Sequence, residues 1–323
     1  MVKELVLLCI ALTASAVVTY TVSGLSSGGF MAHQMHVAYS STVTGAGIVA
    51  AGPYYCSLGS GVVIQTACTE NPWMITISKS IAYATNMASA GLIDPLTNLN
   101  NDPVVIFSGS LDVRIVPGVV QQTQAFYENF INPSKIMTYY NTPANHAWVT
   151  LTEGNPCWYL GSPYVNGCGF DLSGAIFHQL YPTLIAKGTF LPSNLYSFEQ
   201  ADYANIFQAG MSNRGWIYIP TVCKTTPASC TVHVNFHGCD QYYDLIGNTY
   251  VTEIGMNEWA ESNSVVVIYP QTTAITINPE GCWDFWGYTN SNFALKSGLQ
   301  MAAVWNMAQN YTKIITTALT KLD

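Results

Sequence analysis

Hydrophobic and polar positions in the first half of the chain predict alternating strands and helices. Val17–Ser23 alternates between apolar and polar residues, as expected of a strand, whereas Gly29–Ser40 has its apolar residues at helical spacing. Pro103–Ser108 is a continuous apolar run, which is typical of a parallel strand buried on both faces. Two more strands are expected at Ile48–Ala51 and Lys135–Tyr140. This half therefore has the pattern of an α/β sheet.

The second half of the chain repeats this alternation after a segment of different character. Residues 153–200 are rich in Gly, Pro, Asn and Ser, and we interpret them as a connecting region. The elements expected after it are strands at Gly215–Ile219, Thr231–Phe236 and Val265–Tyr269, a helical stretch around Glu253–Glu261, and an amphipathic helix over Ser297–Ala318. No internal repeat or low-complexity linker interrupts the pattern. We therefore expect residues 17–323 to form a single α/β domain with a mostly parallel sheet flanked by helices.

The composition narrows the classes of partner. Only 9% of the 323 residues are charged, 49% are hydrophobic and 12% are aromatic, which excludes a disordered chain. The formal net charge is −8 and no basic stripe is present, so the sequence argues against nucleic-acid binding. An uncharged or insoluble partner fits this surface chemistry better than a polyanion.

The first residues have the features of a secretory signal peptide. Lys3 precedes the apolar run Leu5–Leu12, and Ala14-Ser15-Ala16 resembles a cleavage site, so residues 1–16 are interpreted as a signal peptide. A buried first strand or a short membrane anchor is the alternative. The run is too short for a spanning helix, and no later segment reaches the roughly 18 apolar residues that one needs. We expect an exported protein with no transmembrane segment.

The cysteines agree with an oxidising compartment. Of nine cysteines, Cys9 would leave with the signal peptide, and the remaining eight form an even set. Proximity in the sequence suggests the pairs Cys56–Cys68, Cys157–Cys168 and Cys223–Cys230, which leaves Cys239 with Cys282, although other pairings are possible. Zinc is the competing use of cysteine, but no C-x-x-C or histidine-rich spacing occurs, so no metal is expected.

A short motif after the first strand suggests nucleophilic catalysis. Gly24-Leu25-Ser26-Ser27-Gly28 matches G-x-S-x-G, the strand-to-helix turn that exposes the nucleophilic serine of α/β-hydrolases. This pattern is weak by itself. Asp112 follows the strand at 103–108, and His146 follows the strand at 135–140, in the order serine, acid, base that these enzymes use. A turn aspartate and a structural loop histidine are the alternative interpretations. His33, His36, His178 and His233 are given no catalytic role.

A second motif explains why the candidate serine comes so early in the chain. His237-Gly238-Cys239 ends the strand at 231–236 and has the form of the oxyanion loop of esterases. The backbone N–H groups of Ser27 and Cys239 would then stabilise the oxyanion. In an ordinary α/β-hydrolase the His-Gly strand precedes the serine, whereas here it follows. The order predicts a circularly permuted α/β-hydrolase fold.

Several longer blocks make the pattern specific. Val22–Ala32, His237–Cys239, Tyr269-Pro270-Gln271 and Asn278–Asp284 together resemble the polyhydroxybutyrate (PHB) depolymerases, in the order of the single-domain, permuted fungal type. The resemblance spans most of residues 17–315. It implies the triad Ser26, Asp112 and His146, with the Ser27 and Cys239 N–H groups as oxyanion donors.

The resemblance also implies how substrate is bound. In this family a crevice with apolar and aromatic walls binds one polyester chain, and the second tryptophan of Cys-Trp-Asp-Trp lies in it. This chain has Phe285 at that position and Trp286 beside it, so we assign both to substrate binding. Because the residue type differs, preference for the polymer is less secure than ester hydrolysis.

These observations predict a secreted, monomeric serine esterase that cleaves short-side-chain PHB through an acyl-enzyme intermediate and needs no cofactor. No separate polymer-adsorbing domain is expected. Two alternatives stay open at this point: an esterase for small or feruloyl-type soluble esters, and a secreted binding protein that keeps the fold without catalysis.

Overall fold

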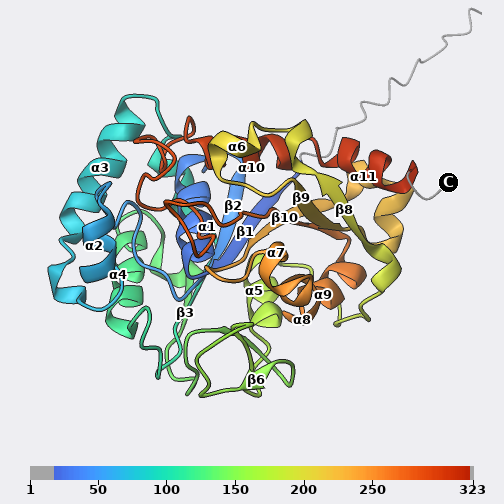
Figure 1. Ribbon diagram of the computed structural model, residues 1–323, viewed down its shortest axis with the longest axis horizontal. Coiled ribbons are helices and arrows are strands. Elements are labelled where there is room, and N and C mark those ends of the chain that lie inside the picture. Colours follow the sequence, from blue (N-terminus) through green and yellow to red (C-terminus); the bar gives the residue numbers. More distant parts are fainter. Residues whose placement is uncertain (1–17, 321–323) are drawn as a thin grey trace, which may run out of the picture.

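An eight-stranded sheet crosses the centre of the computed structural model, which describes residues 18–320 (Figure 1). Its strands are β1 Tyr20–Leu25, β2 Val43–Val49, β3 Val104–Phe107, β4 Ile136–Tyr139, β8 Leu195–Glu199, β9 Arg214–Tyr218, β10 Thr231–Phe236 and β11 Val265–Tyr269. They lie in the order β4-β3-β2-β1-β10-β11-β9-β8. The first six strands of this order are parallel, whereas β9 is antiparallel to both of its neighbours. The expected α/β class with a mostly parallel sheet is confirmed.

β1 lies in the middle of this sheet, although it is the first strand of the described chain. Val22 pairs with Ala46 of β2 on one side and with Val234 of β10 on the other. β3 and β11 are buried along their whole length, as their continuous apolar runs predict. The carboxyl ends of β1, β2, β3, β4 and β10 therefore meet at one edge of the sheet, where an α/β fold places its functional groups.

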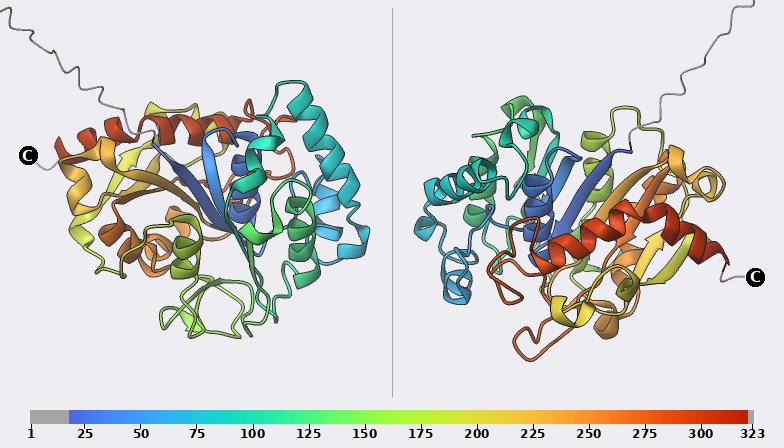
Figure 2. Two further views of the ribbon diagram at one scale, coloured as in Figure 1. Left: turned by 180° about the vertical axis from the view of Figure 1, so that it is seen from behind. Right: turned by 90° about the horizontal axis from the view of Figure 1, so that it is seen from above.

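Helices cover both faces of the sheet (Figure 2). Side chains on β1 alternate between these faces: Tyr20 packs against Trp305, whereas Thr21 is hydrogen-bonded to Tyr181. The face of Tyr20 is covered by α1, α4, α10 and α11, and the face of Thr21 by α5 and α9. The helices are α1 Ser27–Ala38, α2 Gly61–Thr66, α3 Ile77–Ser89, α4 Pro117–Tyr127, α5 Leu172–Leu180, α6 Ile206–Ala209, α7 Tyr243–Ile246, α8 Thr249–Glu253, α9 Met256–Asn263, α10 Leu299–Gln309 and α11 Tyr311–Thr320.

Four expectations about elements need correction. The strand expected at Ile48–Ala51 is β2 Val43–Val49, whose first part contains Gly45 and Gly47 and so lacks the pattern of a strand. Residues 153–200 are more than a connection, because they contain α5 and the edge strand β8. The sequence of β8 mixes polar and apolar residues and therefore does not predict a strand. The helix expected over Glu253–Glu261 is two helices, separated where Gly255 takes a left-handed conformation (φ 75°). The long helix expected over Ser297–Ala318 is interrupted at Asn310, which divides it into α10 and α11.

All four expected disulfide pairings are confirmed, namely Cys56–Cys68, Cys157–Cys168 and Cys223–Cys230, expected from proximity, and Cys239–Cys282, the remaining pair. Cys157–Cys168 fastens a small second sheet of β5 Trp148–Thr150, β6 Asn155–Pro156 and β7 Val165–Gly167. Residues 1–16, assigned to a signal peptide, lie outside the described residues. Across residues 18–320, no helix has the length and apolar character needed to cross a membrane.

Buried histidines lie on both faces of the sheet and are hydrogen-bonded within the core. His233 of β10 lies between the hydroxyls of Thr21 and Ser23, at 2.8 Å and 2.7 Å. His36 of α1 contacts Asp102 and the Tyr127 hydroxyl. Burial lowers the pKa of His33 and of His233 to about 3.

We expect acid to destabilise the fold through three buried histidines, His33, His233 and His237. Burial lowers the pKa of His33 and His233 to about 3 and that of His237 to about 4. The unfolded chain takes up protons near pH 6.5 while these imidazoles stay neutral, so the free energy of unfolding falls as pH drops below 6.5. Each histidine contributes up to about 1.4 kcal/mol per pH unit until its own folded pKa is reached. Urea unfolding at pH 7, 6 and 5 measures the slope.

His233→Asn should reduce this slope by about one proton. His178→Gln, at an exposed position of α5, is the control and should leave the slope unchanged. An unfolding free energy that is flat from pH 7 to pH 5 contradicts the prediction.

Candidate active site

Ser26 occupies a strained turn between β1 and α1. Its backbone angles are φ 57° and ψ −123°, a left-handed φ that is uncommon for a residue with a side chain and costs about 1–3 kcal/mol. Hydrogen bonds hold the turn: Ser26 N–H donates to Val49 O, and Phe30 N–H donates to Ser26 O, both at 2.9 Å. The geometry is that of a nucleophile elbow, because the chain reverses sharply at the carboxyl edge of the sheet.

The glycines of the motif allow this turn to lie against β10. An added Cβ on Gly28 would be 2.3 Å from the carbonyl oxygens of both Phe236 and His237. An added Cβ on Gly24 would be 2.2 Å from Gly28 O. No real Cβ fits at such distances, so both positions require glycine for close approach and not for backbone freedom.

Asp112 and His146 are brought together from the loops after β3 and β4. His146 Nδ1 is 2.8 Å from Asp112 Oδ2, and both side chains are almost fully buried. Asp112 Oδ1 accepts hydrogen bonds from Arg114 N–H at 2.8 Å and Ile115 N–H at 2.9 Å. The carboxylate therefore keeps a fixed orientation and favours the tautomer of His146 that carries its proton on Nδ1.

The two loops also support each other through the backbone. Ser110 N–H donates to Thr142 O at 2.8 Å, and Leu111 N–H donates to Ala144 O at 3.0 Å. Within residues 18–320 no protein group is hydrogen-bonded to His146 Nε2, which leaves this nitrogen available as a base. No hydrogen bond joins Ser26 Oγ to His146 among these residues. In hydrolases without substrate that contact is often long and tightens on binding.

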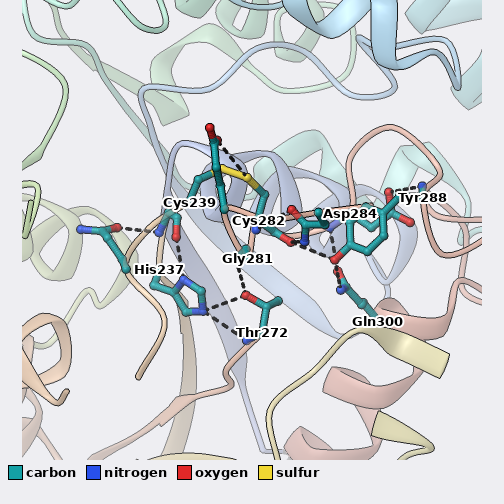
Figure 3. The surroundings of a disulfide bond; sticks show 12 residues. His237, Cys239, Thr272, Gly281, Cys282, Asp284, Tyr288 and Gln300 are labelled. Atoms are coloured by element: carbon teal, nitrogen blue, oxygen red, sulfur yellow. Dashed lines mark hydrogen bonds between the residues drawn. A yellow bond between two sulfur atoms is a disulfide. The ribbon is translucent and has the colours of Figure 1, made fainter. Parts of the chain in front are cut away.

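The His237 loop lies against the serine. His237 Nδ1 donates to Gly238 O at 2.7 Å, and Nε2 accepts from Thr272 N–H at 3.2 Å (Figure 3). Burial lowers the pKa of His237 to about 4, so its imidazole is neutral near pH 7 and supports the loop through hydrogen bonds. Gly238 N–H donates to Gln241 Oε1 at 2.6 Å, and an added Cβ on Gly238 would be 3.3 Å from Ser26 Cβ.

Two backbone donors next to Ser26 have no protein acceptor. Within residues 18–320 neither Ser27 N–H nor Cys239 N–H donates a hydrogen bond to the protein. Ser27 is the first residue of α1, where helix N–H groups have no intrahelical acceptor, and Cys239 is half-buried. Two free donors beside a candidate nucleophile suit an oxyanion. Cys239 is held by its disulfide to Cys282 (Figure 3). Glu280 lies close to this pair, but a disulfide offers no thiolate to a metal.

The two aromatic residues assigned to substrate binding differ in position. Phe285 is buried and stacks on Phe30 of α1, with ring centroids 4.2 Å apart. Trp286 is only half-buried and meets Phe285 edge-on at 5.1 Å. Phe285 therefore forms a base for Trp286, and Trp286 presents the more accessible ring.

Several polar residues outside the predicted catalytic set support the site. Gln241 binds Gly238 N–H, Thr272 binds His237, and the Asp284 carboxylate accepts backbone N–H groups of the aromatic loop. Gln241 and Thr272 follow the motifs His237–Cys239 and Tyr269–Gln271 within two residues, which was the available clue. The roles of Ser26, Ser27, Asp112, His146, Cys239, Phe285 and Trp286 stay predictions.

Comparison with known proteins connects this geometry to one family. No family model matches the chain. It is 34% identical over 303 residues to a polyhydroxybutyrate depolymerase of Talaromyces funiculosus, a match that covers 88% of this chain and 86% of the relative. The chain belongs to the polyhydroxybutyrate depolymerase family. It is also 43% identical over 288 residues to a poly(3-hydroxybutyrate) depolymerase of Delftia acidovorans, covering 88% of this chain but only 58% of that relative.

Solved structures of PHB depolymerases share the fold. The crystal structure of the PHB depolymerase from Penicillium funiculosum superimposes with a TM-score of 0.83 at 32% identity, over 91% of this chain and 95% of that one. A PHB depolymerase with a serine-to-alanine substitution, in complex with an R3HB trimer, matches equally well. The family resemblance expected from the sequence is confirmed.

The packing of the elbow against β10 is tested by Gly28→Ala. A Cβ at this position must displace α1 or the His237 loop, so we expect hydrolysis of p-nitrophenyl acetate to fall about 100-fold or more. Gly61→Ala is the matched control, because the nearest atom to its added Cβ is 3.8 Å away. A fully active Gly28→Ala enzyme contradicts the prediction.

The orienting role of Asp112 is tested by Asp112→Asn. The amide can donate to His146 Nδ1 and so favour the tautomer that has its proton on Nε2, which cannot accept a proton from serine. We expect kcat for an aryl ester to fall by about 10⁴-fold with the fold intact. Asp94→Asn, which alters a carboxylate bound to Ser41 and Lys296 away from this site, should retain activity. Equal activity of the two variants would count against the assignment.

Proposed function

We propose that this protein is a serine esterase of the PHB depolymerase type. His146 Nε2 takes the proton of Ser26 Oγ as the oxygen attacks the ester carbonyl. The Ser27 and Cys239 N–H groups stabilise the negative charge that develops on the carbonyl oxygen. His146 then protonates the departing alkoxide, which leaves an acyl-enzyme. Water, activated by His146, hydrolyses this intermediate and restores Ser26.

The observation that supports this proposal most strongly is the placement of two unpaired backbone donors around a strained serine. Ser27 and Cys239 are far apart along the chain, and their N–H groups have no protein acceptor within residues 18–320. The buried Asp112–His146 pair lies at the same edge of the sheet. A fold retained only for binding has no need of these features together.

We propose a polyester of short-side-chain (R)-3-hydroxy acids as substrate. A relative of the same fold was solved in complex with an R3HB trimer, and both curated relatives are named as PHB depolymerases. Phe285 and Trp286 offer aromatic surface beside α1, and few charges oppose contact with an uncharged polymer. An esterase for small or feruloyl-type soluble esters is the alternative, because a phenylalanine replaces the family's tryptophan at position 285.

Three further assignments complete the proposal. Export is supported by four disulfides and by the sequence of residues 1–16. Circular permutation is supported by the position of β1 between β2 and β10, strands that are far apart along the chain. Residues 17–323 would act as a single catalytic domain and a monomer.

Two measurements test the function. The protein should clear a PHB suspension, and a fluorophosphonate probe should label it in a reaction that is lost in Ser26→Ala. Cleavage of soluble aryl esters without clearing would favour the alternative substrate class. A folded protein that the probe does not label would favour a binding protein.

A further inference from the structure

The aromatic loop of residues 284–289 is joined to the catalytic elbow by ring packing. Phe30 lies one helical turn beyond Ser26, to which its N–H is hydrogen-bonded, and Phe285 stacks on it with an interplanar angle of 10°. Trp286 packs edge-on against Phe285, and its ring centroid lies 4.7 Å from that of Tyr288. The position of the accessible Trp286 ring relative to Ser26 therefore depends on the conformation of this loop.

One buried carboxylate sets that conformation. Asp284 Oδ1 accepts the backbone N–H groups of Trp286, Gly287 and Tyr288 at 3.1, 2.6 and 3.1 Å. Its Oδ2 accepts the N–H and the hydroxyl of Thr289 at 2.9 and 2.6 Å. Five donors thus converge on one side chain that is only 1% exposed.

The charge of Asp284 is balanced by N–H and O–H groups alone. Within residues 18–320 no lysine, arginine or histidine forms an ion pair with it. Burial raises the pKa of Asp284, while the hydrogen bonds from residues 286–289 act in the opposite direction. Such charge-assisted bonds are about twice as strong as neutral ones, and all five would be weakened by removing the charge.

The flanks of the loop connect it to the oxyanion side of the site. Gln300 accepts Asp284 N–H at 2.7 Å and donates to the Tyr288 hydroxyl at 2.7 Å (Figure 3). That hydroxyl donates to Cys282 O at 2.9 Å, and Cys282 is bonded to Cys239. The loop and the Cys239 N–H thus belong to one connected frame.

We propose that Asp284 is a positioning residue for ester-chain binding: its carboxylate fixes the loop so that Trp286 presents its ring to the chain bound at Ser26. The proposal rests on the proposed function. Asp284 does not touch the reacting atoms, so its loss should weaken binding of an extended substrate while the chemistry at Ser26 continues.

Asp284→Asn is the main test, because the amide has the same shape but must direct an NH₂ group at donors that need an acceptor. With a soluble (R)-3-hydroxybutyrate trimer, we expect KM to rise about tenfold while kcat changes less than about threefold. With p-nitrophenyl acetate, which has only a two-carbon acyl group, kcat/KM should fall by a clearly smaller factor than with the trimer.

Two variants guard against a purely structural effect. Thr289→Val removes one donor to Asp284 and leaves the backbone in place, so KM for the trimer should rise by a smaller factor. Asp171→Asn alters another carboxylate that holds a turn, through Gly174 N–H and Trp259, and should leave both substrates unaffected. If Asp284→Asn fails to fold, the KM of Thr289→Val for the trimer tests the proposal instead. An unchanged KM in the folded variants overturns the proposal.

A double-mutant cycle with Trp286→Ala shows whether Asp284 acts through Trp286. If it does, Asp284→Asn raises KM in the wild-type background but has no further effect once Trp286 is alanine. Additive effects would overturn the proposal. A wild-type protein that cleaves aryl esters but not the trimer would instead overturn the proposed substrate. The same cycle would then be measured with aryl esters of increasing acyl length, where Asp284→Asn should penalise only the longer chains.

Discussion

The close approach of α1 to the end of β10 is the constraint on which the candidate active site depends. Gly28 lies against the carbonyl oxygens of Phe236 and His237, at a distance that no side chain tolerates. This contact brings together the Ser27 N–H at the start of α1 and the Cys239 N–H beyond β10. A serine at the tip of the same turn then lies between a rigid helix and a rigid strand. Preorganised donors of this kind stabilise developing charge without having to move during the reaction.

The partners of each buried histidine distinguish catalysis from support. His233 and His237 use both ring nitrogens for hydrogen bonds with neutral groups, and burial keeps them uncharged. His146 has a carboxylate on Nδ1, while Nε2 has no protein partner within residues 18–320. A carboxylate favours the imidazolium that forms during proton transfer. His36 also contacts a carboxylate, that of Asp102, but its other ring nitrogen is hydrogen-bonded to the Tyr127 hydroxyl and is not free to act as a base. Neighbouring groups, more than residue type, thus determine which histidine can act as a base.

Cys239–Cys282 and Asp284 extend this frame from the reacting atoms toward the binding surface. The disulfide joins positions 43 residues apart, and in the chain-entropy model such a closure stabilises the fold by about 4 kcal/mol. Two residues beyond it, Asp284 gathers the backbone of the aromatic loop around one charge. The Cys239 segment and the aromatic loop are therefore held by one connected set of covalent and hydrogen bonds.

The amino-acid sequence by itself determined the parts that depend on local pattern. Buried parallel strands such as β3, β10 and β11 were predicted within a residue or two, because a strand covered on both faces must be continuously apolar. Three disulfides followed from short spacings and Cys239–Cys282 from elimination, and the family followed from motif blocks. The edge strand β8, the break at Asn310 and the division at Gly255 escaped prediction, since pairing partners and backbone conformation decide them. Only the tertiary structure showed that the N–H groups of Ser27 and Cys239 lack a protein acceptor within residues 18–320, that Phe285 supports Trp286, and that five donors converge on Asp284. These depend on distances between segments far apart in the sequence, which no local pattern encodes.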